Sequence, residues 1–301
     1  MRLVLAASLV LLAASCGGSS VRWHFSRDAG VRIDNAVSAE ALERPDGSIV
    51  VYANSPTGIE AWRSRDGLSF RRVRGRMPFG AHPTVVRLPD GRLRMYYATP
   101  SDLPVRPSQL RSASSRDGYV WFLDDGVRFG DIGFGVMEVV PLPDGTWRLF
   151  HNDRRVDGSS RILSARSTRG LTFHLEPGVR LPAPYVDPAV VRLPSGAWLM
   201  AVSTIEKGRR QRIHLAESED GLRWRVEPRP LFDDPGASDF DPTLLALPHG
   251  RYRLYYTRSR GSVFEVLSGV VRARGCRPRP RSRPARQVSG SPFALPREAR
   301  R

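Results

Sequence analysis

Two short turns alternate along this chain, and their repetition constrains the fold more than any other feature. The turns of the first kind are SRDGLSF (64–70), SRDGYVW (115–121), STRGLTF (167–173) and SEDGLRW (218–224). The aromatic residues that end them, taken together with Trp23, are spaced by 47, 51, 52 and 51 residues. The turns of the second kind place Pro-x-Gly before an aromatic-rich run, in RPDGSIVVYA (44–53), LPDGRLRMYYA (88–98), LPDGTWRLFH (142–151), LPSGAWLMAV (193–202) and LPHGRYRLYY (247–256). A period of this length, repeated along a whole chain, predicts an architecture of equal units.

One copy of the repeat predicts one small antiparallel sheet. PTVVRL (83–88) is a short apolar run of the kind found in buried strands, and PDG then turns the chain because Pro presets φ and Gly accepts the left-handed region. RLRMYYA alternates polar and apolar residues, QLRSASS is a third strand, and YVWFL follows the Asp-Gly turn as a fourth. One such sheet cannot bury both of its faces alone, whereas five packed radially can. The sequence therefore predicts an all-β fold, a five-bladed β-propeller of four-stranded antiparallel blades.

The fifth copy is incomplete, and the missing piece lies at the other end of the chain. FEVLSGVVRA (264–273) can form a third strand, but no Asp-Gly turn follows it. The segment VRWHFSRDAGVRI (21–33) resembles LRWRVEPRPLF (222–232). We expect the N-terminal segment to supply the outer strand of the last blade and close the ring, which gives a propeller domain at 21–273.

The two ends of the chain differ in composition from the repeats. Residues 1–15 are predicted to be a signal peptide with the apolar run LVLAASLVLL (3–12), and AASC (13–16) resembles a lipobox that would make Cys16 the diacylated residue, followed by a linker at 16–20. We therefore expect a protein of the bacterial cell envelope, anchored by Cys16 in the outer membrane or at the cell surface. The alternative is an ordinary secretory signal and a secreted or periplasmic protein. Residues 274–301 are rich in Arg and Pro and are predicted to be a disordered basic tail, which either lies along anionic lipids or is an unselected extension.

The net charge of +17 invites a nucleic-acid interpretation, which the composition does not favour. Lys207 is the single lysine, so the arginine excess is typical of a GC-rich genome, and no nucleic-acid-binding motif accompanies it. We expect no nucleic-acid partner and a monomer. Two cysteines provide no disulfide framework, so the fold must be stabilised by packing.

Acidic and histidine side chains recur where the first strand of each copy begins. AHPTVV carries His82, VDPAVV carries Asp187, and DFDPTLL carries Asp239 and Asp241. The first and third copies have Glu40 and Glu138 two residues farther on, a step that keeps the same face of a strand. These side chains are expected to converge on the central channel, beside the long loops at 98–109, 151–160 and 203–212. Paired carboxylates, one protonated and one ionised, are what glycoside hydrolysis needs.

Residues 21–273 resemble the five-bladed propeller glycosidases of glycoside hydrolase families 43, 32, 117 and 130. The resemblance rests on DPAVVRLPSGAWLMAV, DPTLLALPHGRYRLYY, the SxDGxxW turns and the count of five copies. In family 43 an Asp in blade one is the base, an Asp in blade two tunes it and a Glu in blade three is the acid. Here blade one offers Glu40, blade two offers His82, and Glu138 in blade three is offset by two residues. The Asp-Gly turns also resemble the Asp boxes of sialidases, but those enzymes have six blades and an arginine triad that cannot be placed in this chain.

The function we predict is a carbohydrate-active propeller that acts on an oligosaccharide or polysaccharide. As a glycoside hydrolase it would use Glu138 as acid and Glu40 as base, with Asp187 and Asp241 tuning charge or holding sugar hydroxyls. The other expected ligand-binding residues are His82, Asp239, His151, Arg154 and Arg155. No cofactor and no transition-metal site is expected, with a calcium ion in the channel as the alternative.

The rival functions are a non-catalytic glycan-binding module and a propeller that docks a partner protein. A basic rim would favour an anionic glycan, and a neutral glycan is the alternative. The residues expected on that rim are Arg106, Arg154, Arg155, Lys207, Arg209, Arg210, Arg258 and Arg260.

Overall fold

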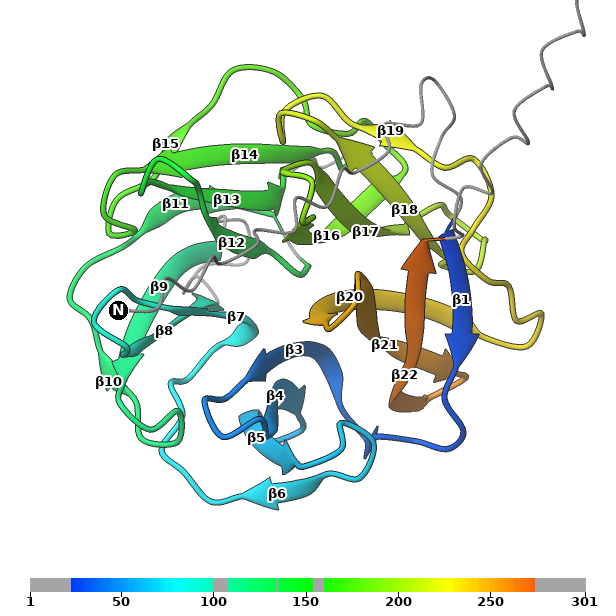
Figure 1. Ribbon diagram of the computed structural model, residues 1–301, viewed down its shortest axis with the longest axis horizontal. Coiled ribbons are helices and arrows are strands. Elements are labelled where there is room, and N and C mark those ends of the chain that lie inside the picture. Colours follow the sequence, from blue (N-terminus) through cyan, green and yellow to red (C-terminus); the bar gives the residue numbers. More distant parts are fainter. Residues whose placement is uncertain (1–22, 100–107, 134, 154–159, 274–301) are drawn as a thin grey trace, which may run out of the picture. The chain divides into compact units, whose positions relative to one another are not determined.

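The computed structural model of the protein describes residues 23–99, 108–133, 135–153 and 160–273. These residues form five antiparallel sheets arranged as a ring (Figure 1), and no helix occurs among them. Accordingly, the described part of the chain has no helix that is long and apolar enough to cross a bilayer. The prediction of an all-β, five-bladed propeller is confirmed.

Each blade follows the chain through consecutive strands. Blade one contains β3 (Val37–Glu43), β4 (Ile49–Ser55), β5 (Gly58–Ser64) and β6 (Arg71–Val73). Blade two contains β7 (Ala81–Arg87), β8 (Leu93–Thr99), β9 (Ser108–Ser115), β10 (Phe122–Leu123) and β11 (Phe129–Ile132). Blade three contains β12 (Glu138–Pro141), β13 (Trp147–Asn152), β14 (Ile162–Ser167) and β15 (His174–Leu175). Blade four contains β16 (Tyr185–Arg192), β17 (Trp198–Thr204), β18 (Ile213–Ser218) and β19 (Arg225–Val226).

Blade five is completed by the N-terminal segment, as predicted. It contains β20 (Ser238–Leu247), β21 (Arg251–Arg260), β22 (Val263–Ala273) and β1 (Trp23–Arg27), and β2 (Ile33–Asp34) also pairs with β22. The register of the closing pair runs from Trp23 opposite Ala273 to Arg27 opposite Gly269. This pairing covers the outer edge of β22 with the first strand of the chain and closes the ring.

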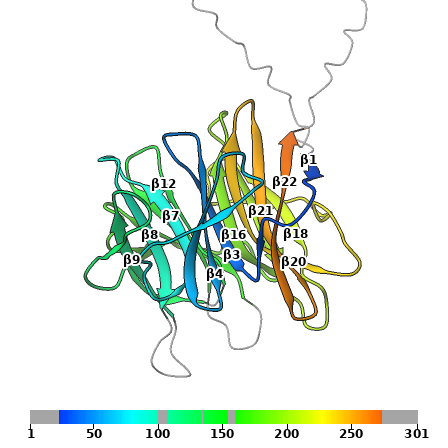
Figure 2. The same ribbon diagram turned by 90° about the horizontal axis from the view of Figure 1, so that it is seen from below.

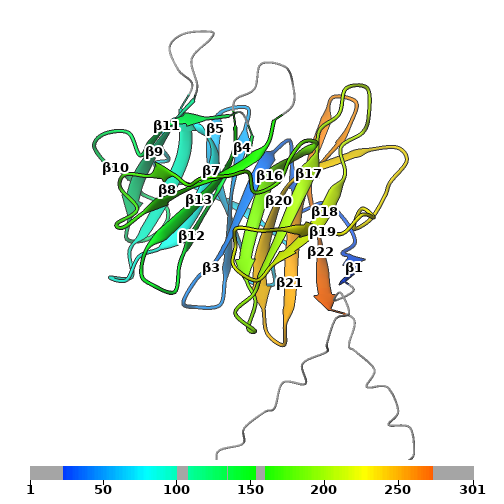
Figure 3. The same ribbon diagram turned by 90° about the horizontal axis from the view of Figure 1, so that it is seen from above.

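The first strand of every blade lies innermost (Figure 1), and the longer strands run roughly along the ring axis (Figures 2 and 3). The Pro-x-Gly turns join first and second strands at one end of the ring. The starts of the first strands and the connections between second and third strands lie at the other end. This arrangement gathers the strand-start residues at a single mouth.

Two details differ from the repeat pattern. The fourth strands of blades two, three and four have only two residues each, although the sequence predicts a longer strand after the turn. The first strand of blade three begins late, at Glu138, and residues 135–137 approach the end of β13 and the start of β16 as irregular backbone.

The core lies between blades rather than in the middle of the ring. Five clusters of buried apolar side chains each join two neighbouring blades. In the cluster between blades one and two, Tyr52 and Met95 are fully buried. Burial on this scale at every blade interface is the main stabilising contribution.

The Asp-Gly turns dock each blade onto the previous one, which explains their repetition. The serine that opens each turn accepts a hydrogen bond from the peptide N–H of the turn glycine, at 2.8–2.9 Å in all four copies. A buried tyrosine of the preceding blade donates its hydroxyl to that glycine's carbonyl oxygen in three copies, from Tyr52, Tyr96 and Tyr255 at 2.9, 2.8 and 3.0 Å. The aromatic residue that closes the turn meets the same ring edge-on, as Trp121 meets Tyr52 at 5.7 Å. The aromatic residue of each turn therefore packs between neighbouring sheets.

Candidate functional site

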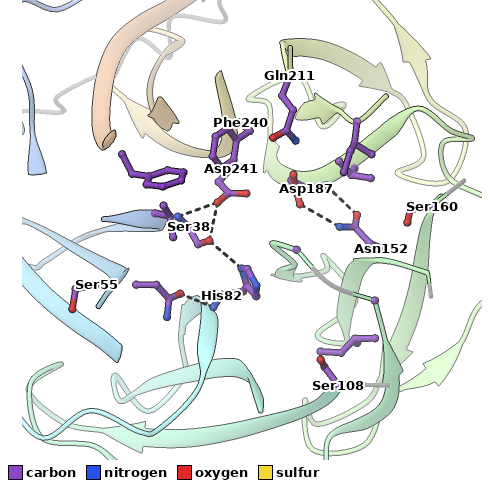
Figure 4. Close-up of a pocket in the computed structure, with 18 of the residues that line it drawn as sticks. Ser38, Ser55, His82, Ser108, Asn152, Ser160, Asp187, Gln211, Phe240 and Asp241 are labelled. Atoms are coloured by element: carbon purple, nitrogen blue, oxygen red, sulfur yellow. Dashed lines mark hydrogen bonds between the residues drawn. The ribbon is translucent and has the colours of Figure 1, made fainter. Parts of the chain in front are cut away.

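A cavity of about 800 Å³ opens at the mouth formed by the strand starts and the connections between second and third strands. Its described lining consists mostly of amide, hydroxyl, carboxylate and apolar side chains (Figure 4). The polar and charged lining residues are Asn35, Ser38, Asn54, Ser55, His82, Ser108, Asn152, Asp153, Ser160, Asp187, Gln211 and Asp241. This is a lining with many hydrogen-bond donors and acceptors, as a hydroxyl-rich ligand requires.

Four lining residues occupy one repeated backbone position. Ser38, His82, Asp187 and Asp241 each stand nine residues before a Pro-x-Gly glycine, where their strands depart from regular register. Their φ angles lie between 49° and 56°, in the left-handed region that non-glycine residues seldom adopt. Strained backbone of this kind persists only where the surroundings hold it, and it clusters at functional sites. Blade three has Val136 at the equivalent position.

The strain is held by side chains of the neighbouring blade. The peptide N–H of each bulged residue donates to an acceptor that stands seven residues after a Pro-x-Gly glycine on the preceding second strand. The pairs are His82 with Asn54 at 2.8 Å, Asp187 with Asn152 at 3.0 Å, Asp241 with Ser203 at 3.1 Å and Ser38 with Thr257 at 3.2 Å. These acceptors were not predicted from the sequence, although their fixed spacing from the turn glycine was a signal that could have found them.

Asp187 is held as a carboxylate by two donors. Its Oδ1 accepts from the peptide N–H of Val136 at 3.1 Å and from the Asn152 amide at 3.2 Å. Gly135 allows this approach, because a Cβ there would lie 2.3 Å from both Asp187 Oδ1 and Asn152 Nδ2. Burial raises the pKa of Asp187 to about 6, and the hydrogen bonds oppose that rise.

Asp241 lies in the same cavity and has a higher pKa. Its Oδ2 accepts from the Ser38 peptide N–H at 3.1 Å and from the Ser38 hydroxyl at 2.8 Å. Burial and the negative charge of Asp187 raise the pKa of Asp241 to about 8, against the effect of these hydrogen bonds. In Figure 4 both carboxyl groups project into the cavity from adjacent blades. Two carboxyl groups with pKa values on either side of neutrality share this space.

Glu40 and Glu138 form a second tier, and neither is among the described residues that line the cavity. The two-residue offset carries them farther along the channel, where Glu40 accepts hydrogen bonds from the Val85 peptide N–H at 3.0 Å and the Thr243 hydroxyl at 2.9 Å. Thr84 lies between the two glutamates, with its Oγ1 3.0 Å from Glu138 and 3.5 Å from Glu40. Burial raises the pKa of Glu40 to about 7, and burial together with Glu40 raises the pKa of Glu138 well above its usual value. The expected single funnel of carboxylates is therefore two tiers.

The remaining predicted site residues are placed as follows. His82 lines the cavity, and burial lowers its pKa to about 4, so its imidazole is neutral at neutral pH. His151 is buried beside Phe129, and its Nδ1 lies 2.9 Å from the Asn152 carbonyl oxygen. Asp239 forms a buried ion pair with Arg258, at 2.7 and 3.1 Å. Neither His151 nor Asp239 is among the described lining residues.

The predicted basic rim is only partly described. Arg106, Arg154 and Arg155 lie outside the described residues, as do Cys16 and the tail at 274–301. The described arginines of the predicted rim form ion pairs with nearby carboxylates. The pairs are Arg258 with Asp239, Arg260 with Asp234, Arg209 with Glu206 and Arg210 with Asp233. The described cavity lining contains no arginine or lysine. Also within the described chain, no group of three or more His, Cys, Asp or Glu is arranged to hold a metal ion.

Comparison with solved structures finds the same propeller fold in several proteins. A thermostable family-43 glycoside hydrolase superposes with a TM-score of 0.65 at 16% identity, covering 85% of this chain and 98% of that one. An endo-arabinase from Bacteroides thetaiotaomicron superposes with a TM-score of 0.62 at 15% identity, covering 83% of this chain and 99% of that one. An N-acetylgalactosamine deacetylase from F. plautii, in complex with blood group B trisaccharide, superposes with a TM-score of 0.63 at 13% identity, covering 83% of this chain and 92% of that one.

The resemblance to family-43 glycoside hydrolases is thus confirmed at the level of the fold. No protein-family model matches the sequence, and no curated protein sequence is detectably similar.

Proposed function

We propose that this propeller is a glycoside hydrolase that binds an oligosaccharide in the cavity, with Asp241 as the general acid and Asp187 as the general base. One observation carries the proposal: two buried carboxyl groups project into one cavity, and their pKa values are about 8 and about 6. At neutral pH the first is mostly protonated and the second mostly ionised. Carboxyl pairs separated in this way are suited to acid and base roles.

The reaction can be written with the residues present. Asp241 donates its proton to the glycosidic oxygen as the bond to the anomeric carbon breaks. Asp187 takes a proton from the water molecule whose oxygen bonds to that carbon. One water is consumed, Asp241 ends ionised and Asp187 protonated, and proton exchange with solvent restores both. This course inverts the anomeric centre. A course in which Asp187 attacks the carbon directly retains it, and the anomer of the first product distinguishes the two.

Glu138 and Glu40, the acid and base expected from the sequence, have a weaker case. They are separated from the described lining by a step along the channel, and their hydrogen bonds are made to Thr84, Thr243 and backbone. We propose that they support the floor of the site.

The lining favours a neutral sugar. Amides and hydroxyls such as Asn54, Ser108 and Gln211 can exchange hydrogen bonds with sugar hydroxyls. Phe240 and Phe264 lie on the blade-five side, with ring centroids 6.5 Å apart at 90°, and offer an apolar surface to the C–H face of a sugar ring. An anionic glycan would need cations from Arg106, Arg154 and Arg155, outside the described residues.

A non-catalytic glycan-binding propeller is the second candidate. It is favoured by Ser38, His82 and Val136, which occupy the strand-start position in blades one to three where carboxylates would be expected of a family-43 active site. Such a module would bind glycans without turnover. The solved structures named above share the scaffold and act on carbohydrates by more than one reaction, so the scaffold supports the ligand class better than the reaction.

The test is hydrolysis and binding across neutral and uronate-containing oligosaccharides, with wild type, Asp187→Asn and Asp241→Asn. The matched control is Asp90→Asn, an exposed carboxylate on a Pro-x-Gly turn at the other end of the ring. We expect each cavity variant to lose about 100-fold or more in kcat/KM while the control keeps wild-type activity. Binding without turnover in the wild type would favour the module, and full activity in both cavity variants would refute the assignment.

A further inference from the structure

The strand-start residues of blades five, one and two are joined by side-chain hydrogen bonds. The Ser38 hydroxyl oxygen lies 2.8 Å from Asp241 Oδ2 and 3.0 Å from His82 Nδ1 (Figure 4). All three residues stand at positive φ, at 53°, 49° and 52° for Ser38, Asp241 and His82. Side chains from three blades therefore meet at one hydroxyl group, and each comes from a residue with the same bulged backbone.

A hydroxyl group has one proton, which fixes the direction of this chain once one contact is assigned. Asp241 Oδ2 also accepts from the Ser38 peptide N–H at 3.1 Å, a donor that it shares with Thr257 Oγ1 at 3.2 Å, so Ser38 directs two donors at the same carboxyl oxygen. With its proton directed at Asp241, the Ser38 oxygen can only accept from His82. The donors then run from His82 Nδ1–H to Ser38 Oγ–H to Asp241 Oδ2, and the acidic proton of Asp241 belongs on Oδ1.

We infer that Ser38 and His82 are positioning residues that hold the proton of Asp241 on Oδ1, toward the cavity, where a glycosidic oxygen would receive it. The inference rests on the proposed function in taking Asp241 as the acid. It adds that the hydroxyl of Ser38 and the Nδ1–H tautomer of His82 are parts of the machinery, although neither touches the reacting atoms.

Other titratable groups near Asp241 do not provide this orientation. Asp187 on β16 raises the pKa of Asp241 through its negative charge. Glu40 on β3 reaches Thr243 in the tier below. On β20 itself, the Asp239 carboxylate is paired with Arg258. Within the described chain, Ser38 supplies both of the hydrogen bonds that hold Asp241 Oδ2.

The first test is the pH profile of Ser38→Gly. Glycine accepts the positive φ and keeps the peptide N–H, so only the hydroxyl is lost. Because that hydroxyl stabilises the carboxylate, we expect the alkaline limb of kcat to move up by about one pH unit and kcat to fall about tenfold. An unmoved alkaline limb would overturn the inference, since a purely structural loss lowers activity without shifting the limb.

The second test compares His82→Asn with His82→Gly. Asparagine places an N–H donor close to the position of Nδ1 and tolerates positive φ, whereas glycine keeps only the backbone. We expect the Asn variant to restore the wild-type alkaline limb and the Gly variant to shift it as Ser38→Gly does. Identical limbs in the two variants would refute a role for the donor.

An independent test needs no substrate. In ¹⁵N NMR spectra of the free protein, the His82 ring should be the Nδ1–H tautomer, and in ¹³C spectra the carboxyl of Asp241 should titrate at higher pH in Ser38→Gly than in wild type. A bare Nδ1 would overturn the inference, because Ser38 would then donate to His82. If both signatures are found but no glycan is hydrolysed, the positioning stands and the proposed hydrolase fails. If glycans are hydrolysed and the NMR signatures are absent, the proposed hydrolase stands and the positioning role of Ser38 and His82 fails.

Discussion

Replacing Glu40 with Gln should make the stability of the propeller less dependent on pH. Burial raises the pKa of Glu40 from 4.5 to about 7 in the folded protein. Below pH 4.5 the residue is protonated in both states, and its contribution to stability is complete. As the pH rises from there, the unfolded chain loses the proton while the folded protein retains it, so stability falls until about pH 7.

The magnitude follows from the same two values. Each pKa unit corresponds to about 1.4 kcal/mol, so the rise from 4.5 to about 7 corresponds to a loss on the order of 3 kcal/mol. A glutamine in place of Glu40 would carry no charge and could keep a hydrogen bond to the Val85 N–H and another with Thr243. Its side chain would therefore add no pH dependence of its own.

Urea unfolding followed by tryptophan fluorescence, at several values between about pH 5 and about pH 8, measures the effect. We expect the free energy of unfolding of Glu40→Gln to rise relative to wild type across this range. Glu43→Gln, at the exposed end of the same strand, controls for the substitution because its side chain is in solvent in both states. A difference from wild type that stays constant with pH would refute the reasoning, since Glu40 would then be ionised in the folded protein at neutral pH.

Three further predictions test the frame around the site. Gly135→Ala should lower Tm and activity together, because its Cβ would overlap the blade-four carboxyl group and its φ is 120°, whereas Gly130→Ala, with open space around it, should change neither. Tyr96→Phe should cost about 1–3 kcal/mol in urea unfolding by leaving a buried turn carbonyl unpaired, while Tyr119→Phe, whose buried hydroxyl has no partner among the described residues, should cost much less. Cys16→Ser should release the protein from the membrane fraction; if it stays bound in low and high salt alike the lipobox interpretation fails, and release only by high salt indicates that the basic tail is a second anchor.

The fold could be predicted from the sequence because its determinants are local and repeated. The hydrogen bonds and backbone angles that form each turn involve residues only a few positions apart, such as the serine and glycine of each Asp-Gly turn. One copy of the repeat is therefore enough to predict the local structure of the others. The closing strand was also accessible, because Trp23 matches the aromatic of the other outer strands and β1 pairs as that match predicts.

The site was only partly predictable, because its geometry depends on neighbouring blades. His82, Asp187 and Asp241 reach the cavity as expected, but Ser38 was missed because a serine at a strand start carries no chemical signal by itself. The depth of Glu40 was not accessible either. A step of two keeps a side chain on the same face of its strand, but the bulge at Ser38 sets which tier that face reaches.

The measurement that tests the central claim most directly is the crystal structure of Asp241→Asn soaked with an oligosaccharide that the wild-type protein binds. We expect sugar density in the cavity between the substituted side chain and Asp187, with a ring face against Phe240 or Phe264 and hydroxyl groups on the surrounding amides. Ligand density bound elsewhere on the propeller, with the cavity empty, would contradict the proposed site.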